Sequence, residues 1–186
     1  MYATLDTKST NELYLQRKGW FSREIELTDN AAYDYGKIKC HRLSRHIATV
    51  ITAANTWIFK RAQNSGRYIS VTDANGVVVG TATRDIFSRV TILSLQTGFV
   101  AKFYKPSIWS LHYVWKSDGY GEIMHIDGRS FSLRETVSID QSRTPVSLIP
   151  LLIFLGSYLV ILKKWRNTAM IRGLLPIFIG SHGVNK

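Results

Sequence analysis

One uncharged run of seventeen residues, from Val146 to Leu162 (VSLIPLLIFLGSYLVIL), limits what this chain can fold into more than any other feature. It follows the helix-start pattern Ser142-Arg-Thr-Pro145 and ends at a basic, tryptophan-containing segment. A run this apolar must leave water, either in a bilayer or inside a protein shell. Seventeen helical residues at about 1.5 Å each reach only the short end of a membrane span. The location of this run therefore decides the class of the protein.

Two main interpretations of the run compete, a membrane span and a helix packed inside a barrel, with a helix lying in the membrane interface as a third. Its length, its lack of charge and its basic edge favour a membrane span, because tryptophan prefers the interface and long cations can extend to it. The positive-inside rule opposes a span, since the tail that would have to cross contains five cations and no acid. These cations are Lys163, Lys164, Arg166, Arg172 and Lys186. We expect a span, and keep as the alternative a helix packed inside a barrel.

The chain before this run has the pattern of an antiparallel all-β domain. Short stretches rich in Val, Ile, Tyr, Phe, Trp and Thr are interrupted at regular intervals by Gly, Asn and Asp. The clearest hairpin turns at Asp73-Ala-Asn75-Gly76, and Asp118-Gly119 and Asp127-Gly128 repeat the signal. The spacing predicts roughly ten to twelve strands. So many short strands must hide their edges, which predicts a mainly β fold, a closed antiparallel barrel with one C-terminal hydrophobic helix.

These signals divide the chain into four parts. We expect an N-terminal tail over 1–11, the β domain over 12–142, the hydrophobic helix over 143–166 and a basic C-terminal tail over 167–186. Within the last part, Ala169 to Gly180 is a second apolar piece, too short to cross a membrane.

The strand-rich region, its Asp-x-x-Gly hairpins with valine-rich return strands, and one apolar helix on the C-terminal side together resemble the tubby C-terminal-like group. This group contains the tubby, phospholipid-scramblase-like and LURP-one-related domains, and the resemblance covers roughly residues 12–165. It implies twelve strands closed around a central helix. Such helices tend to be rich in small residues, whereas this one carries Leu, Ile, Phe154 and Tyr158. Tubby proteins bind phosphoinositide head groups through basic side chains, and no position here matches that pocket closely enough to carry over.

The charge of the chain predicts an anionic partner. Lys and Arg number 24 against 13 Asp and Glu, a net charge of +11. No acid occurs between Asp34 and Asp73, so this stretch is the candidate site for anionic lipid or a membrane partner. A solvated outer face is the simpler alternative. The candidate residues are Lys37, Lys39, Arg42, Arg45, Lys60, Arg61 and Arg67.

Nucleic acid is a rival anion, because aromatic side chains beside cations can stack bases. No nucleic-acid-binding motif supports this third hypothesis. The aromatic candidates are Trp57, Phe59, Tyr68, Trp109, Tyr113 and Trp115.

Catalytic and cofactor-binding motifs are missing, so we expect a non-catalytic protein without a cofactor or metal. Cys40 and His41 are neighbours, but adjacent strand residues face opposite ways, which predicts a plain buried thiol. His112 and His125 could meet across a strand, although two imidazoles alone make a poor metal site.

From the single cysteine and the absence of a secretory signal we expect the β domain to lie on the cytoplasmic side. The predicted function is a membrane-associated binding or scaffold module. The alternative is a soluble barrel that binds a lipid-like ligand around a buried helix. Under the first interpretation, the membrane-interface residues are Lys163, Lys164, Trp165 and Arg166.

Overall fold

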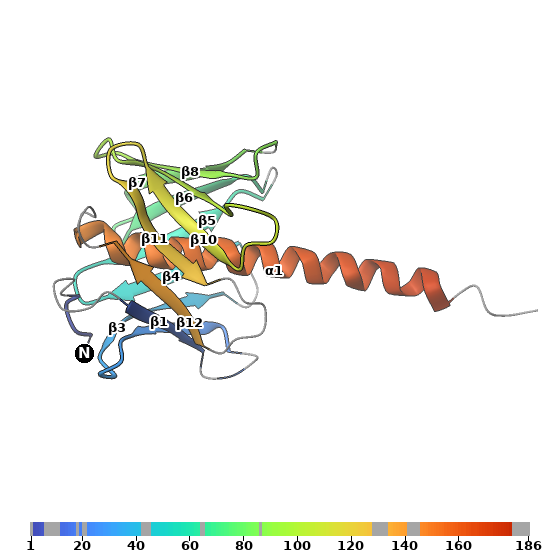
Figure 1. The fold of residues 1–186 in the computed structure, drawn as a ribbon, viewed down its shortest axis with the longest axis horizontal. Coiled ribbons are helices and arrows are strands. Elements are labelled where there is room, and N and C mark those ends of the chain that lie inside the picture. Colours follow the sequence, from blue (N-terminus) through green and yellow to red (C-terminus); the bar gives the residue numbers. More distant parts are fainter. Residues whose placement is uncertain are drawn as a thin grey trace, which may run out of the picture.

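Twelve antiparallel strands form one closed barrel in the computed structural model of this chain (Figure 1). Each strand pairs with its neighbours in sequence, and β1 pairs with β12 to close the ring. The structure describes residues 2–5, 12–17, 19, 22–41, 46–63, 66–85, 87–127, 134–140 and 146–179, with helix side chains described as far as Trp165. The strands are β1 (Glu12–Arg17), β2 (Glu24–Thr28), β3 (Asp34–Cys40), β4 (Ile47–Thr52), β5 (Thr56–Arg61), β6 (Tyr68–Asp73), β7 (Val78–Arg84), β8 (Thr91–Leu95), β9 (Val100–Tyr104), β10 (His112–Ser117), β11 (Gly121–Asp127) and β12 (Arg134–Ile139).

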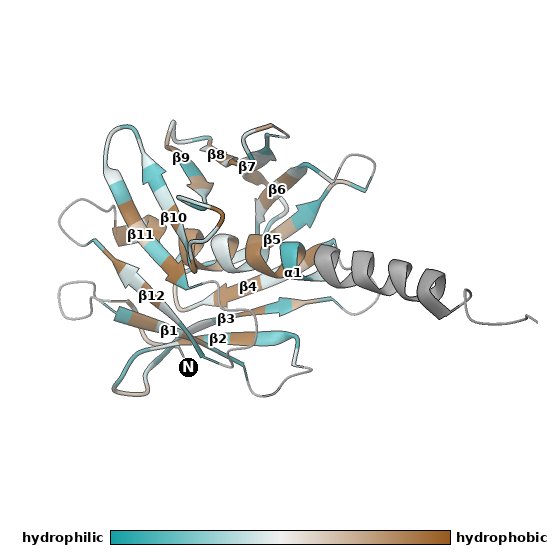
Figure 2. Cartoon of the chain, turned by 45° about the vertical axis from the view of Figure 1, so that its right-hand side comes forward, coloured by the Kyte–Doolittle hydropathy of each residue, from teal (hydrophilic) through white to brown (hydrophobic). Residues whose placement is uncertain are grey.

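The strand alternation that predicted this fold class is present in the barrel wall. In β5, Trp57 and Phe59 are buried, whereas Lys60 points outward and is exposed. The same alternation of apolar and polar residues appears as brown and teal segments along the strands in Figure 2. Because every second side chain faces the lumen, closing the sheet produces an apolar interior that must be filled.

A single helix, α1 (Ile149–Ile179), fills that interior after a short 3-10 turn at Val146–Leu148. Its residues from Ile149 to Tyr158 are buried within the barrel, apart from the half-buried Pro150. The preferred interpretation of an external span was therefore wrong for this run, and the packed helix describes it. By length and composition Val146–Trp165 could cross a membrane, but a barrel lumen offers the same dry surroundings.

Size complementarity explains how so bulky a helix fits. Several inward-facing wall residues are small and fully buried, among them Ala48, Ala82 and Ala101. Where the wall residues are large, the helix has a glycine instead. A Cβ added to Gly156 would lie 2.5 Å from Ile126 Cδ1 and 2.8 Å from Trp115 Nε1. The departure from small-residue helices noted in the sequence is thus matched by small residues on the opposing strands.

One buried hydrogen bond fixes the helix against the wall. The indole N–H of Trp115 donates to the backbone carbonyl of Leu152 at 2.9 Å. A buried indole requires an acceptor, and the absence of a side chain at Gly156 lets the ring approach the helix backbone.

The helix is longer than predicted. It was expected to end near Arg166, yet α1 continues as one element to Ile179, over most of the segment assigned to a basic tail. The residues that follow the buried part extend a helix whose first turns are already fixed by the barrel, so each adds a backbone hydrogen bond at low entropic cost. Figure 1 shows this part of α1 projecting from one end of the barrel.

Candidate functional site

The two ends of the barrel have opposite charge. Strands of a closed antiparallel meander alternate in direction, so all odd-numbered strands end at the same rim. We call this end the basic rim. Its described cations lie at the ends of odd-numbered strands, at the starts of even-numbered ones, in the loops between them and on α1. They are Arg17, Arg23, Arg61, Arg67, Arg84, Arg89, Lys105, Lys163 and Lys164; Arg134 starts β12 at this rim, but its guanidinium reaches Asn30 in the β2–β3 loop.

The opposite end, the acidic rim, contains aspartates. They are Asp29, Asp34, Asp73, Asp118 and Asp140. The described loops there contain no Lys or Arg. The basic rim includes the carboxylates of Glu24, Asp85, Asp127 and Glu135, so the separation is strong without being complete. Because β12 ends at the acidic rim, α1 enters the lumen there and leaves through the basic rim.

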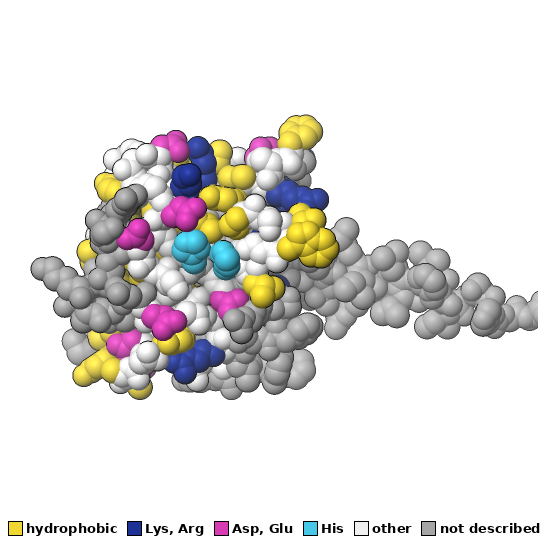
Figure 3. All heavy atoms as spheres, viewed as in Figure 1, with side chains coloured by type: hydrophobic (Ala, Val, Ile, Leu, Met, Phe, Trp, Pro, Cys, Tyr) yellow, Lys and Arg dark blue, Asp and Glu magenta, His cyan; other side chains and the backbone are white. Residues whose placement is uncertain are grey.

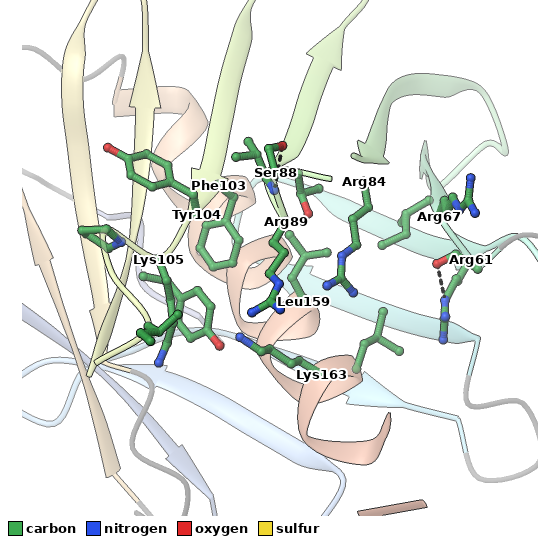
Figure 4. A pocket seen from close by; sticks show the side chains of 18 of the residues that line it. Arg61, Arg67, Arg84, Ser88, Arg89, Phe103, Tyr104, Lys105, Leu159 and Lys163 are labelled. Atoms are coloured by element: carbon green, nitrogen blue, oxygen red, sulfur yellow. Dashed lines mark hydrogen bonds between the residues drawn. The ribbon is translucent and has the colours of Figure 1, made fainter. Parts of the chain in front are cut away.

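A cavity of about 460 Å³ opens at the basic rim beside the emerging helix. This is a size typical of small-molecule sites. Its apolar side chains include Ile69, Val90, Phe103, Tyr113, Leu159 and Leu162. Its cations are Arg61, Arg67, Arg84, Arg89, Lys105 and Lys163, and no acid is among the described residues that line it. In Figure 4, Arg89 and Lys163 point into the same space next to Leu159.

Strand phase brings these cations into the mouth. In β5 the inward residues are Trp57 and Phe59, and the next residue in phase is Arg61, which is half-buried and lines the cavity. In β7 the inward Ala82 is followed in phase by Arg84, also half-buried. β9 shows the same pattern: its inward-facing residues are followed in phase by Lys105, which lies in the next loop and lines the cavity. These cations therefore belong to the lumen side of the wall, which a solvated outer face does not explain.

Tyr113 forms an aromatic wall between two lysines. Its ring stacks on Phe103 with centroids 5.2 Å apart and an interplanar angle of 9°. The amine of Lys105 lies 5.4 Å from the centre of the Tyr113 ring and that of Lys163 lies 5.1 Å away. Burial raises the pKa of the Tyr113 phenol, an effect that Lys105 and Arg84 oppose. The phenol thus stays neutral at physiological pH and can donate a hydrogen bond to an anion.

A buried ion pair joins α1 to the barrel wall at the same rim. Lys164 Nζ lies 2.7 Å from Oε1 of Glu135, an inward-facing residue of β12 that is almost completely buried. Trp165 is partly buried and packs against the core. These contacts fix the end of the buried helix and hence the position of Lys163 in the pocket.

The structure divides the predicted basic stretch. Arg61 and Arg67 line the pocket, whereas Lys37, Lys39 and Lys60 lie on the outer wall. The amines of Lys37 and Lys39 are 3.7 and 3.0 Å from carboxylate oxygens of Glu24 on the adjacent strand. The pairing of β2 with β3 thus places an acid beside both lysines, away from the pocket, and their role in binding an anion stays a prediction. Arg42 and Arg45 lie outside the described residues.

The predicted membrane-interface residues lie where the helix leaves the barrel, at its mouth. Lys163 lines the pocket, Lys164 forms the ion pair, and the side chain of Arg166 lies outside the described part. Sequence reasoning missed Arg84, Arg89 and Lys105, which lie beyond the acid-free stretch. Extending the inward phase of each strand to its end would have found them.

The aromatic surface expected of a nucleic-acid binder is not assembled. Trp57, Phe59, Tyr113 and Trp115 are buried, while Tyr68 and Trp109 are exposed. The four buried rings belong to the core and to the pocket wall, so they cannot stack on a strand of bases.

Reactive groups elsewhere in the described chain have structural surroundings. Cys40 is buried, and burial raises the pKa of its thiol to about 11. His41 is exposed and contacts the hydroxyl of Thr49. His112 and His125 do meet across adjacent strands, with ring centroids 5.3 Å apart, and two neighbouring imidazoles are visible in Figure 3. Among the described residues, no group of three His, Cys, Asp or Glu could hold a metal ion.

The fold and the pocket define a class: a closed twelve-strand barrel around a central helix, with a cationic, partly apolar pocket where the helix leaves. No protein-family model, curated protein or solved structure matches the chain.

Proposed function

We propose that this protein is a non-catalytic, membrane-associated module that binds an anionic lipid in the pocket at the basic rim. The observation that carries the proposal is the composition of the pocket. Six cations surround a floor that includes Phe103, Leu159 and Leu162, and no described acid lines it.

This combination matches the two parts of a phospholipid. Arginine and lysine bind phosphate oxygens through charge-assisted hydrogen bonds, and the apolar floor gives the start of an acyl chain a surface that excludes water. A free inorganic phosphate would use the cations alone. A lipid would use both, so a lipid is the ligand that this pocket fits best.

The fold supports the same conclusion through its resemblance to the tubby C-terminal-like group. That group also closes twelve strands around a central helix, and tubby proteins bind phosphoinositide head groups through basic side chains. The cytoplasmic location follows from the same proposal, because anionic phospholipids concentrate in the cytoplasmic leaflet.

The test is a titration with dihexanoyl phosphatidic acid, a short-chain lipid that is monomeric in water, followed by calorimetry. Short-chain phosphatidylcholine and inorganic phosphate are the comparison ligands. We expect phosphatidic acid to bind at least about tenfold more tightly than either, since inorganic phosphate lacks the acyl chains and the choline group of phosphatidylcholine cancels the charge of its phosphate. Phosphate binding as tightly as the lipid would identify a plain anion site instead.

A matched pair of variants locates the binding. Arg89→Glu with Lys163→Glu changes two pocket cations, and Lys60→Glu with Lys116→Glu makes the same charge change on exposed residues of the outer wall. The pocket variant should lose binding, whereas the wall variant should keep it. Equal loss in both variants would mean that net charge, and not this pocket, holds the lipid.

A further inference from the structure

The most exposed large apolar side chains of the described chain gather at the basic rim. Phe87 is 93% exposed, Trp109 85%, Ile108 73% and Leu111 63%. The next in order, Tyr33 at the acidic rim, is 60% exposed. All four come from only two loops, β7–β8 and β9–β10, which also provide pocket residues. Exposed apolar residues in such a cluster mark an interaction surface.

In both loops, hydrogen bonds within the protein satisfy polar groups that lie next to the apolar tips. In the β7–β8 loop, Asp85 accepts hydrogen bonds from the backbone N–H groups of Phe87 and Ser88 and from the hydroxyl of Ser88. In the β9–β10 loop, Lys105 Nζ donates to the Ser110 carbonyl at 2.6 Å. Because these polar groups already have hydrogen-bond partners within the protein, the apolar tips can leave water without leaving those groups unsatisfied.

The charge around the tips selects the partner. Arg89 lies in the same loop as Phe87, and Lys105 in the same loop as Trp109. Figure 3 shows apolar and basic side chains next to each other at the end from which α1 projects. Apolar tips within a basic surface complement an anionic bilayer, whose head groups attract cations and whose interface takes up aromatic rings.

The course of α1 concerns the same end of the barrel. The helix leaves through this rim and its backbone remains helical to Ile179 (Figure 1). In the sequence, Ala169 to Gly180 is apolar except for Arg172. This piece is too short to cross a bilayer, so a membrane contact at this end needs further anchors from the barrel itself.

We propose that the basic rim docks on an anionic membrane with Phe87 and the Ile108–Leu111 tip inserted below the head groups. The barrel axis then stands steeply on the membrane, with the acidic rim facing away. This inference rests on the proposed function and deepens it, because the pocket opens directly onto the lipid it would receive.

The experiment measures binding of the full chain to phosphatidylcholine vesicles with and without phosphatidylserine, by sedimentation. We expect binding only with phosphatidylserine, and weaker binding at high salt. In Phe87→Ser with Trp109→Ser, affinity should fall at least about tenfold per residue, since burial of one large apolar side chain corresponds to about that factor. The control, Tyr33→Ser with Val77→Ser, changes exposed residues at the acidic rim and should bind as the unchanged chain does.

Trp109 also provides a direct signal. Its indole is exposed, those of Trp57 and Trp115 are buried, and that of Trp165 is partly buried. The emission of the unchanged chain should therefore shift to the blue on vesicles and be quenched by brominated acyl chains, and Trp109→Ser alone should remove most of both changes. Absence of both changes, absence of vesicle binding, or full vesicle binding by the tip variant would each overturn the docking surface.

Short-chain phosphatidic acid separates this result from the proposed function. The tip variant should still bind that monomeric lipid, because neither changed residue lines the pocket. Loss of both activities in the tip variant would assign the loops to the pocket and overturn docking. A full chain that needs its tips for vesicles but never binds the monomeric lipid would support docking and reject the pocket.

Discussion

Removal of α1 tests whether the helix is the core of the barrel or an attachment to it. Ending the chain at Asp140 keeps all twelve strands and deletes the lumen filling. The deletion removes eight large aliphatic or phenyl side chains that are at most 5% exposed: Ile149, Leu151, Leu152, Ile153, Phe154, Leu155, Val160 and Ile161.

The magnitude of that loss decides the outcome. Burial of one such side chain contributes about 1.5–3 kcal/mol, so the eight together contribute about 12–24 kcal/mol. A whole domain is stable by only about 5–15 kcal/mol. The indole of Trp115 also loses its acceptor on Leu152. We therefore expect the strands alone not to form a native barrel.

Circular dichroism and thermal melting measure the result. The chain ending at Asp140 should show no cooperative melt and should bind a dye for exposed apolar surface. A chain ending at Arg166 keeps every buried helix residue that the structure describes and should melt cooperatively. If the shorter chain keeps a strand spectrum and unfolds in a sharp transition, the helix does not fill the core, and the reasoning is refuted.

Two further predictions concern single residues. Gly156→Val should destabilise the protein by about 2 kcal/mol or more, because the new methyl groups collide with Trp115 and Ile126. The melting temperature should then fall by about 4–8 °C. Gly119→Val, at a glycine with open space around it, is the control, and equal effects would contradict the close packing. Cys40, with its pKa raised to about 11, should stay protonated at pH 8 and react with iodoacetamide at least about 100-fold more slowly than in urea, since only the thiolate reacts. The native rate should rise with pH up to that pKa, and similar rates in both states would show that the thiol is accessible.

The architecture was largely predictable because it depends on local signals. Alternating apolar residues and turn signals such as Asp73-Ala-Asn75-Gly76 predicted a strand-rich closed barrel, and twelve strands are present. The location of the helix was not predictable in the same way. A bilayer and a barrel lumen are equally apolar, so hydropathy cannot distinguish them. The distinction depends on the pairing of β1 with β12, which lie at opposite ends of the strand sequence.

The site was predicted only in part, for a geometric reason. Counting cations along the chain treats Lys60 and Arg61 as equivalent, yet they lie on opposite faces of β5. Counting also separates Arg61 from Arg84 and Lys105, which the closed sheet brings to one pocket. Membership of the site depends on the phase and direction of each strand, and both become readable only when the strand ends are known.

The order of the elements has a consequence for synthesis. The wall of this barrel is made before its filling, because α1 follows β12 in the chain. At about 5–20 residues per second, residues 141–162 take roughly 1–4 s to translate. Throughout that interval the finished strands have an apolar face with nothing to cover it. The protein is thus exposed to aggregation or chaperone capture at a defined moment, just before the helix that fills the barrel is synthesised.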